Sequence, residues 1–269
     1  DHPRPGKWVE VINNHTKRLL ATGESVVGCF LRYPAATLAE FMALGGWDFI
    51  VFDAEHGSLQ PHDLEDLTRA CELHEVTPMV RVTTNDPSTI LRFLDAGAHG
   101  IHVPSVDSGA AAEAAVQAAK YQPRGSRGLA ATRSAGFGLE APISEYVRRS
   151  NQETLVIAQV ESAEGVANIE ELVAVDGVDV IFIGPTDLSH SLGHVGEPSH
   201  PEVAAAMDRI TDAVSASNKT LGIFVSNATD AVAWQERGAR YILTGLEPLL
   251  SSSTRTYLET VRTTEGATP

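Results

Sequence analysis

Lysine is scarce in this chain, and its scarcity limits how the protein could activate a carbonyl group. The sequence has only four lysines, Lys7, Lys17, Lys120 and Lys219. The first two precede the first expected strand, Lys120 falls in an expected helix, and Lys219 stands before an expected strand. None is placed to form a Schiff base with a bound substrate. Carbonyl chemistry would therefore need a metal ion as its electron sink.

Cysteine, positive charge and long apolar runs are also lacking. Cys29 and Cys71 are isolated, so we expect no disulfide and a cytoplasmic protein. The net charge of −15 argues against nucleic acid or an anionic membrane surface as a partner. No apolar run approaches the length of a membrane span, and no signal-type N-terminus is visible. An anionic substrate would need local positive charge from an arginine or a metal ion.

Short β-rich runs alternate with amphipathic stretches along the whole sequence. We expect eight strands, at residues 26–31, 49–53, 77–82, 100–103, 155–160, 178–183, 220–225 and 241–244. We expect helices at residues 9–20, 37–44, 60–74, 88–96, 109–121, 165–175, 201–217, 229–237 and 249–262. This rhythm predicts an α/β fold, a (β/α)8 TIM barrel that forms a single domain over residues 1–269. A doubly wound open sheet is the alternative, but the glycine-rich turn of a nucleotide site is missing.

Two segments fall outside the repeating pattern. The expected helix at residues 9–20 precedes the first strand and could close the bottom of the barrel. Residues 122–142 form the longest irregular stretch, which contains Arg124, Arg127 and Arg133. A long loop of this kind in a compact barrel is usually functional or part of an interface.

Two acidic residues follow neighbouring expected strands. Glu161 comes directly after the strand at 155–160, and Asp187 follows the strand at 178–183. A strand–helix–strand unit brings both carboxylates to the same rim of a parallel sheet. Each could simply cap the helix that follows it. Two hard oxygen ligands without a neighbouring thiolate or histidine, however, favour a site for Mg²⁺ or Mn²⁺.

Two further residues at this rim can carry chemistry. His56 lies just beyond the strand at 49–53 and close to acidic residues, so a neutral imidazole there could act as a general base. Arg81 is a charged residue inside an apolar strand, and such a residue is rarely buried without an anionic partner. It could close an internal salt bridge or bind a substrate carboxylate or developing enolate, and the sequence leaves both open.

Taken together, these segments resemble the HpcH/HpaI aldolase family, the metal-dependent class II pyruvate aldolases. The motifs occur in family order and cover nearly the whole barrel. They are Phe52-Asp-Ala-Glu-His-Gly, Val80-Arg-Val, Leu94-Asp-Ala-Gly-Ala, Val103-Pro, Gln159-Val-Glu-Ser and Phe182-Ile-Gly-Pro-Thr-Asp-Leu-Ser. Thr83 and Thr186 depart from residues that are common in the family, which leaves the aldehyde acceptor open.

The resemblance implies a role for each matching polar residue. The metal ligands would be Glu161 and Asp187, holding Mg²⁺ or Mn²⁺, with Co²⁺ also possible. The pyruvate group would be held by Gln159 and by the segment Gly184, Pro185 and Thr186.

The remaining implied residues are catalytic. His56 would be the base, and Asp53 would help to orient it. Arg81 would stabilise the charge of the enolate. Asp95 would raise the basicity of a histidine across a subunit interface.

The resemblance also implies an activity and an assembly. The reaction would be reversible cleavage of a 4-hydroxy-2-oxo acid to pyruvate and an aldehyde through a metal-stabilised enolate, in aromatic-compound or sugar-acid catabolism. Oxaloacetate decarboxylation, as in macrophomate synthase, is the alternative. The assembly would be a hexamer, a trimer of dimers, in which the C-terminal helix packs on a neighbouring subunit.

Overall fold

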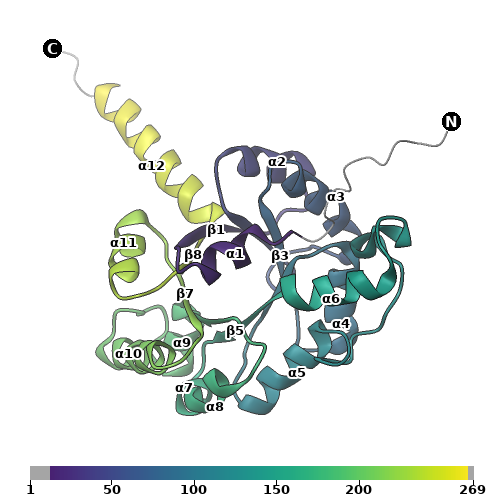
Figure 1. The fold of residues 1–269 in the computed structure, drawn as a ribbon. Coiled ribbons are helices and arrows are strands. Elements are labelled where there is room, and N and C mark those ends of the chain that lie inside the picture. The colour runs from purple at the N-terminus through teal and green to yellow at the C-terminus, as the bar shows by residue number, and fades with distance from the viewer. Residues whose placement is uncertain (1–12, 266–269) are drawn as a thin grey trace.

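Eight parallel strands form a closed barrel in which each strand pairs with the next along the chain and β8 pairs with β1 (Figure 1). The computed structural model describes residues 13–265, and side chains through residue 262. The strands are β1 Val26–Leu31, β2 Phe49–Asp53, β3 Thr77–Arg81, β4 Gly100–Val103, β5 Leu155–Val160, β6 Val180–Ile183, β7 Thr220–Phe224 and β8 Tyr241–Gly245. This order confirms the (β/α)8 TIM barrel, and every expected strand is present.

Helices follow the strands and cover the outside of the barrel. They are α1 His15–Ala21, α2 Ala36–Leu44, α3 Pro61–Glu72, α4 Pro87–Ala96, α5 Gly109–Ala119, η1 Arg133–Gly138, α6 Ile143–Glu153, α7 Ala163–Ala167, α8 Ile169–Ala174, α9 Pro185–Ser191, α10 Pro201–Ser215, α11 Ala228–Glu236 and α12 Leu246–Glu265. The expected helix at 165–175 was wrong as a single helix. Asn168 separates α7 from α8, and its side-chain amide donates a hydrogen bond of 2.8 Å to the carbonyl oxygen of Asp107.

Two other helical segments were not expected from the sequence. The short helix α9 begins directly after β6 and carries Asp187 in its first turn. The helix α6 lies beyond the irregular residues 122–142 and buries Tyr146, Ser150 and Asn151, of which Tyr146 packs with Tyr121 and Ala135. The apolar residues of α6 are confined to its first half, at Ile143, Tyr146 and Val147, and only polar residues follow, so the apolar spacing is too short to reveal a helix.

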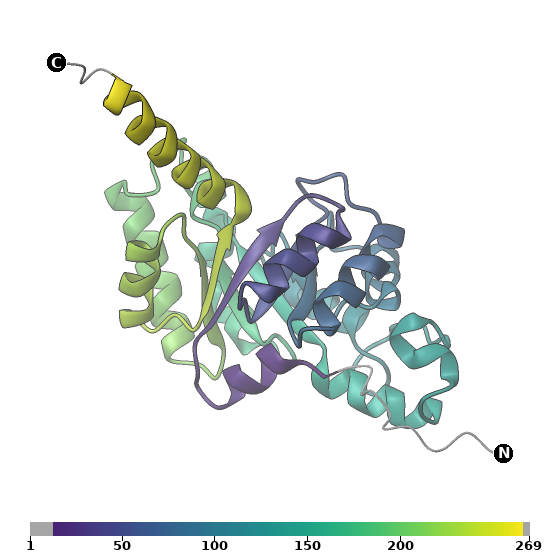
Figure 2. The ribbon, with the colours of Figure 1, turned by 90° about the horizontal axis from the view of Figure 1, so that it is seen from above.

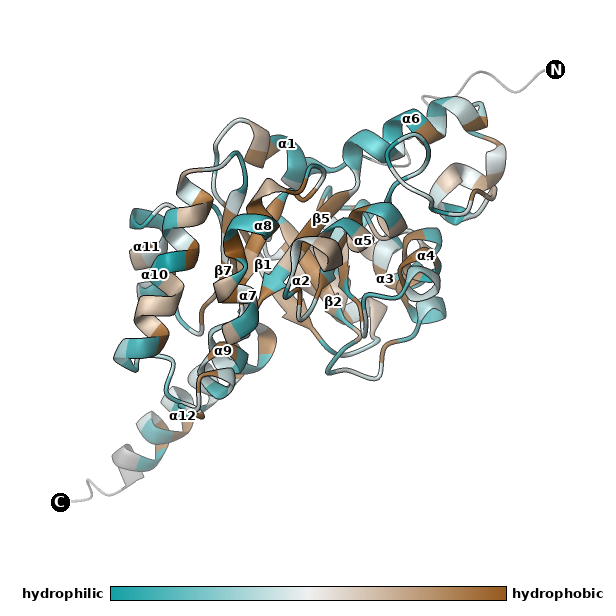
Figure 3. Ribbon diagram, turned by 90° about the horizontal axis from the view of Figure 1, so that it is seen from below, coloured by the Kyte–Doolittle hydropathy of each residue, from teal (hydrophilic) through white to brown (hydrophobic). Residues whose placement is uncertain are grey.

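Apolar side chains fill two separate layers, one inside the barrel and one between the strands and the helices. In the ribbon of Figure 3 the strands are accordingly mostly in the brown of hydrophobic residues. In the inner layer the rings of Phe49 and Tyr241 stack with their centroids 4.3 Å apart. Gly28 makes this packing possible, because a Cβ atom there would lie only 2.1 Å from the Phe49 ring. The inner layer therefore forms a solid support beneath the C-terminal ends of the strands.

The helix α1 closes the N-terminal end of the barrel. Its residue Thr16 is fully buried and donates two hydrogen bonds there: its backbone N–H donates to Thr77 Oγ1 at 3.1 Å, and its hydroxyl donates to the Asp48 carbonyl. Leu19 and Leu20 pack against the inner apolar layer. The expected helix at 9–20 is thus confirmed over its second half, and residues 9–12 lie outside the described residues.

The pairing between β3 and β4 is the shortest in the barrel. Only Val80 with Ile101 and Arg81 with His102 are paired, whereas β2 and β3 are paired at five positions. Pro78 contributes to this difference. Its carbonyl oxygen faces β4 and accepts a hydrogen bond from His99, but proline has no N–H to direct toward the same strand.

The C-terminal helix α12 extends away from the barrel (Figures 1 and 2). Residues 251–262 are all exposed, and the exposed fraction of Tyr257 reaches 69%. Packing of α12 on a neighbouring subunit stays a prediction, since the structure contains one chain. Among the described residues, no helix is long and apolar enough to cross a membrane.

Candidate active site

A cavity of about 210 Å³ opens at the C-terminal ends of the strands. It collects side chains from several strands and from the loops that follow them. The lining residues are Phe30, Arg32, His56, Arg81, Gln159, Phe182, Gly184, Pro185, Thr186, Asp187 and Phe224. The structure thus brings together seven residues that the sequence or the family resemblance singles out: His56, Arg81, Gln159, Gly184, Pro185, Thr186 and Asp187.

A buried ion pair forms one side of this site. Asp53 and Arg81 are paired in register on β2 and β3, and their side chains form two parallel hydrogen bonds of 2.9 and 2.6 Å. Arg32 donates to the same carboxylate from the end of β1, at 3.2 Å. Burial alone would raise the pKa of Asp53, but the hydrogen bonds and charge of Arg81 outweigh it, so the pKa is lowered. Asp53 is therefore an anion that fixes two arginines.

The structure shows one of the two alternatives that the sequence left open for Arg81, the internal salt bridge, and its action on a substrate stays a prediction. The salt bridge with Asp53 uses the Nε and Nη2 atoms, and the guanidinium also stacks over Phe30 at 4.4 Å. No protein hydrogen bond from Nη1 is present among residues 13–265. Arg81 is thus a salt-bridge partner that still lines the cavity and can present Nη1 to a bound anion.

His56 lies at the mouth of the cavity, with about half of its side chain exposed. Its backbone N–H donates to Asp53 Oδ1 at 3.2 Å, so Asp53 holds the loop rather than the imidazole ring. The acidic group nearest to the ring is Glu55, whose Oε2 lies 3.8 Å from His56 Nε2. Burial raises the pKa of Glu55, and the charges of Arg81 and His56 oppose that shift.

Glu161 stands on the other side of the site and is buried, with no cationic partner among residues 13–265. Its Oε1 atom accepts hydrogen bonds from the backbone N–H and hydroxyl of Ser105 at 2.8 and 3.2 Å, and its Oε2 atom accepts one from the Gln159 amide. Burial raises the pKa of Glu161, and the negative charge of Asp187 adds to this rise, while the hydrogen bonds oppose it. The carboxylate is therefore held in place but not neutralised.

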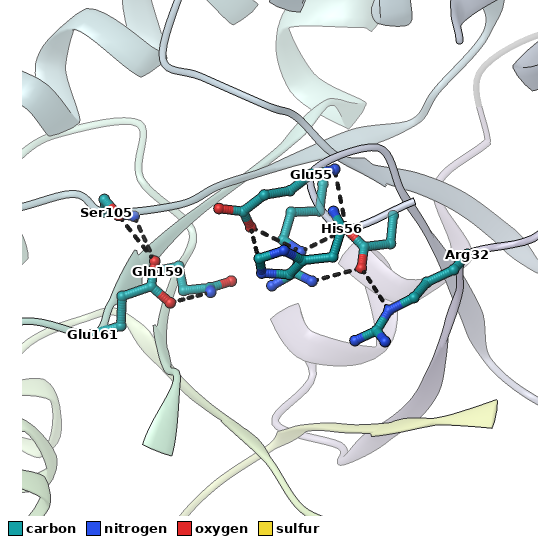
Figure 4. A network of polar contacts seen from close by, with 8 residues as sticks. Arg32, Glu55, His56, Ser105, Gln159 and Glu161 are labelled. Atoms are coloured by element: carbon teal, nitrogen blue, oxygen red, sulfur yellow. Dashed lines mark hydrogen bonds and ion pairs between the residues drawn. The ribbon is translucent and has the colours of Figure 1, made fainter. Parts of the chain in front are cut away.

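The segment after β6 closes around Glu161. A Cβ atom on Gly184 would lie 2.7 Å from Glu161 Oε2, so the position accepts no larger residue without a shift. Asp187 is exposed in the first turn of α9, on the same side of the cavity. Figure 4 shows Ser105, Gln159 and Glu161 on one side of the site and Arg32, Glu55 and His56 on the other.

A histidine inside the barrel lies beneath Gln159. His102 is fully buried and its Nε2 atom lies 2.6 Å from the hydroxyl of Tyr241. Burial, followed by the charge of Arg81, lowers its pKa to about 3, while an interaction with Gln159 raises it. Neither His102 Nδ1 nor Gln159 Oε1 makes a complete hydrogen bond among the described residues. His102 is thus a neutral group next to the amide that contacts Glu161.

Four residues of this site were given no role from the sequence: Arg32, Glu55, Ser105 and His102. Arg32 and Ser105 could have been found, because both closely follow strand ends, as Glu161 does. Ser105 also has a φ of 50°, a strained conformation for a residue with a side chain, and one that lets it donate twice to Glu161. His102 gave no local signal, because its partner Tyr241 is distant in sequence.

Asp95 lies outside the barrel, near the C-terminal end of α4. Its Oδ1 atom accepts a hydrogen bond of 2.7 Å from the buried Arg127. It does not line the cavity that contains His56. An action on a histidine across a subunit interface would need a second chain, so this role stays a prediction.

The lysines within the described residues are all hydrogen-bonded outside the cavity, as expected. Lys17 and Lys120 donate to the Thr154 carbonyl, and Lys219 donates to the Val175 carbonyl at 2.7 Å. Lys7 lies outside the described residues.

A (β/α)8 barrel with acidic and cationic side chains gathered around a cavity at its C-terminal rim has the design of an enzyme. The sequence model of the HpcH/HpaI aldolase/citrate lyase family matches residues 26–251, and the chain belongs to this family.

Two named relatives are aldolases. The chain is 36% identical to the pyruvate aldolase of Rhizobium etli over 240 residues, covering 89% of this chain and 93% of that protein. It is 35% identical over 240 residues to the 5-keto-4-deoxy-D-glucarate aldolase of Escherichia coli, covering 88% of this chain and 91% of that protein. The crystal structure of a family protein from Burkholderia cenocepacia superposes with a TM-score of 0.88 at 34% identity, over 93% of this chain and all of that one.

Proposed function

We propose that this protein catalyses the reversible aldol cleavage of a 4-hydroxy-2-oxo acid to pyruvate and an aldehyde, with the help of a divalent cation. One observation carries the proposal. Arg81, whose Nη1 atom makes no protein hydrogen bond among the described residues, lines one cavity together with the exposed His56 and Asp187. Glu161 is buried beside Gln159 and Gly184 of the same cavity, and it has no cationic partner in the described part of the chain. The names of the aldolase relatives support the same class of reaction.

The acidic side of the cavity suits a hard cation such as Mg²⁺ or Mn²⁺. Glu161 and Asp187 would hold it, since both offer carboxylate oxygens at the same rim. The raised pKa of Glu161 means that its charge is poorly compensated by the protein alone, and a cation would compensate it. A side chain at position 184 would crowd Glu161 Oε2, so the glycine there keeps this oxygen unobstructed.

When bound, the cation would supply Lewis-acid polarisation of a 2-oxo acid. The residues of the chain do the rest. Gln159 and the segment from Gly184 to Thr186 bind the oxo-acid end of the substrate. Arg81 directs Nη1 at the oxygen on which negative charge develops, and Asp53 keeps that guanidinium from reorienting. Preorganised charge of this kind usually contributes more to the rate than any other effect.

His56 would move the proton of the substrate 4-hydroxyl group. In the cleavage direction its imidazole accepts this proton as the carbon–carbon bond breaks, and in the addition direction it returns the proton. Its exposed position at the cavity mouth suits a group that meets the aldehyde end of the substrate. A positioned general base of this kind typically contributes about 10²–10⁴-fold to the rate.

Proton exchange on pyruvate alone tests the proposal without an aldehyde. In D₂O with Mg²⁺ or Mn²⁺ we expect the methyl signal of pyruvate to disappear from the proton NMR spectrum. EDTA should stop the exchange and added metal should restore it. Borohydride should leave it unchanged, because the described lysines face away from the cavity. Exchange that survives EDTA, or inactivation by borohydride, would contradict the proposal.

A second measurement separates aldol cleavage from oxaloacetate decarboxylation. Pyruvate release is compared for oxaloacetate and for a 4-hydroxy-2-oxo acid, with His56→Gln as the variant. The variant should lose most of the aldol cleavage, since that reaction needs the hydroxyl proton to be moved. Decarboxylation has no such hydroxyl group and should be affected less.

The assembly belongs to the same proposal. A homo-oligomer, a hexamer built as a trimer of dimers, is supported by the extended helix α12, whose residues 251–262 are exposed in the single chain. Asp95 would act at an interface of this oligomer. Light scattering should show no active species near the 28.7 kDa of one chain. A cytoplasmic location is supported by the two cysteines, both buried and free.

A further inference from the structure

Two histidines and a glutamate converge outside the candidate active site, the histidines in the loop between α9 and α10 and the glutamate in the first turn of α10. The metal-ligating atoms of His194, His200 and Glu202 all lie within 4.8 Å of one another. None of the three residues lines the cavity described above. Within the described part of the chain, this is the one group of at least three histidine, cysteine or acidic side chains that is close enough to share an ion.

The loop between α9 and α10 is held in a defined conformation by backbone hydrogen bonds. The N–H of His194 donates to the Ser189 carbonyl at 2.8 Å, and the N–H of Glu197 donates back to the His194 carbonyl at 3.0 Å. Gly193 occupies the left-handed region with φ of 85°, which lets the chain turn directly after α9. The donors are therefore brought together by a defined turn rather than by chance contact of long side chains.

His200 also has a fixed orientation. It precedes α10 as its N-cap, and its Nδ1 atom accepts a hydrogen bond of 3.3 Å from the backbone N–H of Glu202. The ring of His200 stacks on that of His194 at 3.4 Å between centroids, and a ring nitrogen of His194 contacts the Glu202 carboxylate. Three potential ligands thus already contact one another.

We propose that His194, His200 and Glu202 form a binding site for Zn²⁺ or a similar transition metal ion, distinct from the candidate active site. Two imidazoles and one carboxylate are a typical zinc ligand set with a fourth position open to water, whereas Mg²⁺ prefers oxygen ligands alone. The ion can enter from solvent, because 70% of the Glu202 side chain is exposed.

Binding of an ion requires the three side chains to move from the positions that they have in the structure. Ligand atoms at about 2.1 Å from a tetrahedral zinc ion lie about 3.4 Å apart, so some donors must approach by about 1 Å. Rotation of the exposed Glu202 side chain can supply part of this movement. The stacked histidine rings must also tilt, since in-plane lone pairs of parallel rings do not converge on one point.

The site would fasten the end of α9 to the start of α10. Since α9 begins with the segment that carries Asp187, a bound ion would restrain an element that belongs to the candidate active site. The competing interpretation is that the three side chains form only an ion pair and a ring stack that hold the loop without metal.

Metal binding to untagged, chelator-treated protein distinguishes the two. The measurement uses the Glu161→Gln/Asp187→Asn variant as background, so that a cation at the candidate active site does not contribute. Calorimetry should show one Zn²⁺ bound per chain, and Co²⁺ should give the visible absorption of a four-coordinate ion with nitrogen ligands. His200→Asn should lower the Zn²⁺ affinity at least tenfold, because asparagine keeps the helix cap but removes the imidazole.

His190→Gln is the matched control, since His190 is an exposed histidine on the neighbouring helix α9. It should leave Zn²⁺ binding and the Co²⁺ spectrum unchanged. Equal affinity in the background protein and in its His200→Asn variant would overturn the proposal. So would a Co²⁺ spectrum that persists after His194→Gln. Because the background lacks the acidic pair of the active site, these outcomes do not depend on the proposed aldolase activity.

Discussion

The two sides of the candidate active site solve the same electrostatic problem in opposite ways. On the side formed by β1, β2 and β3, the buried carboxylate of Asp53 is bound by Arg81 and Arg32. On the side formed by β5 and β6, the buried carboxylate of Glu161 accepts only neutral donors, and its charged neighbour is Asp187. On the first side the negative charge of Asp53 is compensated by the protein itself, whereas on the second side the protein leaves an excess of negative charge.

The pKa shifts express this difference. The pKa of Asp53 is lowered and that of Glu161 is raised, although burial pushes both upward. A buried acid with a raised pKa is a common sign of a functional site, because stability alone would select against it. The comparison teaches that the charge of Asp53 is compensated by two arginines of the protein itself, while the charge of Glu161 has no such compensation among the described residues.

Removal of the acidic ligands should have the largest effect. Glu161→Gln or Asp187→Asn should lower metal-dependent pyruvate formation by about 10³-fold or more, because the charge stabilisation that a metal supplies is worth several kcal/mol. Steady-state assays with a Mn²⁺ titration measure this loss. Circular dichroism is the control for folding. A variant that keeps the metal affinity of the parent protein would remove its residue from the set of ligands.

Removal of the buried carboxylate on the arginine side should lower the free energy of unfolding. Asp53→Asn leaves Arg81 buried without its anionic partner, and breaking a buried ion pair from one side costs about 3–5 kcal/mol of unfolding free energy. Urea denaturation in EDTA measures it. Glu161→Gln under the same conditions should cost much less, or stabilise, since it removes a poorly compensated charge. Equal losses for the two variants would abolish the contrast between the two sides.

The pH dependence of stability should have opposite signs for the two acids. The folded-state pKa of Glu161 is raised. Its contribution to the free energy of unfolding is therefore fully present below the ordinary pKa of 4.5 and is lost as the pH rises through the folded-state pKa. The folded-state pKa of Asp53 is lowered. Its contribution to the free energy of unfolding is therefore present above the ordinary pKa of 3.8 and is lost as the pH falls through the folded-state pKa.

Metal-free denaturation curves between pH 4 and pH 7 compare the wild type with each single variant. The difference between wild type and Glu161→Gln should become less favourable to the wild type as the pH rises. The difference for Asp53→Asn should not decline over that range. If the stability difference changed with pH in the same way for both variants, the opposite pKa shifts of Glu161 and Asp53 would be contradicted.

The smallest effect concerns the buried histidine beneath Gln159. His102→Leu should lower kcat a few-fold, because Gln159 loses a polar neighbour that helps to fix its amide. The pH–rate profile should keep its shape, since the pKa of His102 is about 3 and its charge does not change near neutrality. Tyr241→Phe is the matched control for core packing. A shifted profile in the His102 variant would show that this residue takes part in proton transfer.

The sequence predicted the barrel and most of the acidic site for a shared physical reason. Parallel strands buried on both faces are short apolar runs, and the residues just beyond them reach the same rim. Glu161, Asp187 and His56 were therefore found by position alone. The pairing of Asp53 with Arg81 was not predicted, although both residues stand at strand ends. Their contact depends on the register between β2 and β3, which the sequence does not give.

Other features depend on contacts that no local pattern records. The contact of His102 with Tyr241 joins β4 to β8 across the barrel interior. The second half of helix α6 is polar in sequence, and Asn151 is buried there because its side chain hydrogen-bonds the backbone of Tyr121. The interruption at Asn168 follows from a side-chain hydrogen bond to a carbonyl group of another loop. In each case the deciding partner is distant in the chain.

The short pairing of β3 with β4 has a consequence for motion within the barrel. This is the boundary between the strands that carry Arg81 and those that carry Gln159 and Glu161, and Pro78 leaves it one amide donor short. Segments with fewer backbone hydrogen bonds open at lower free energy. Deuterium should therefore replace the amide protons of β4 sooner than those of β2, so that the two sides of the cavity separate locally while the remaining strands stay protected.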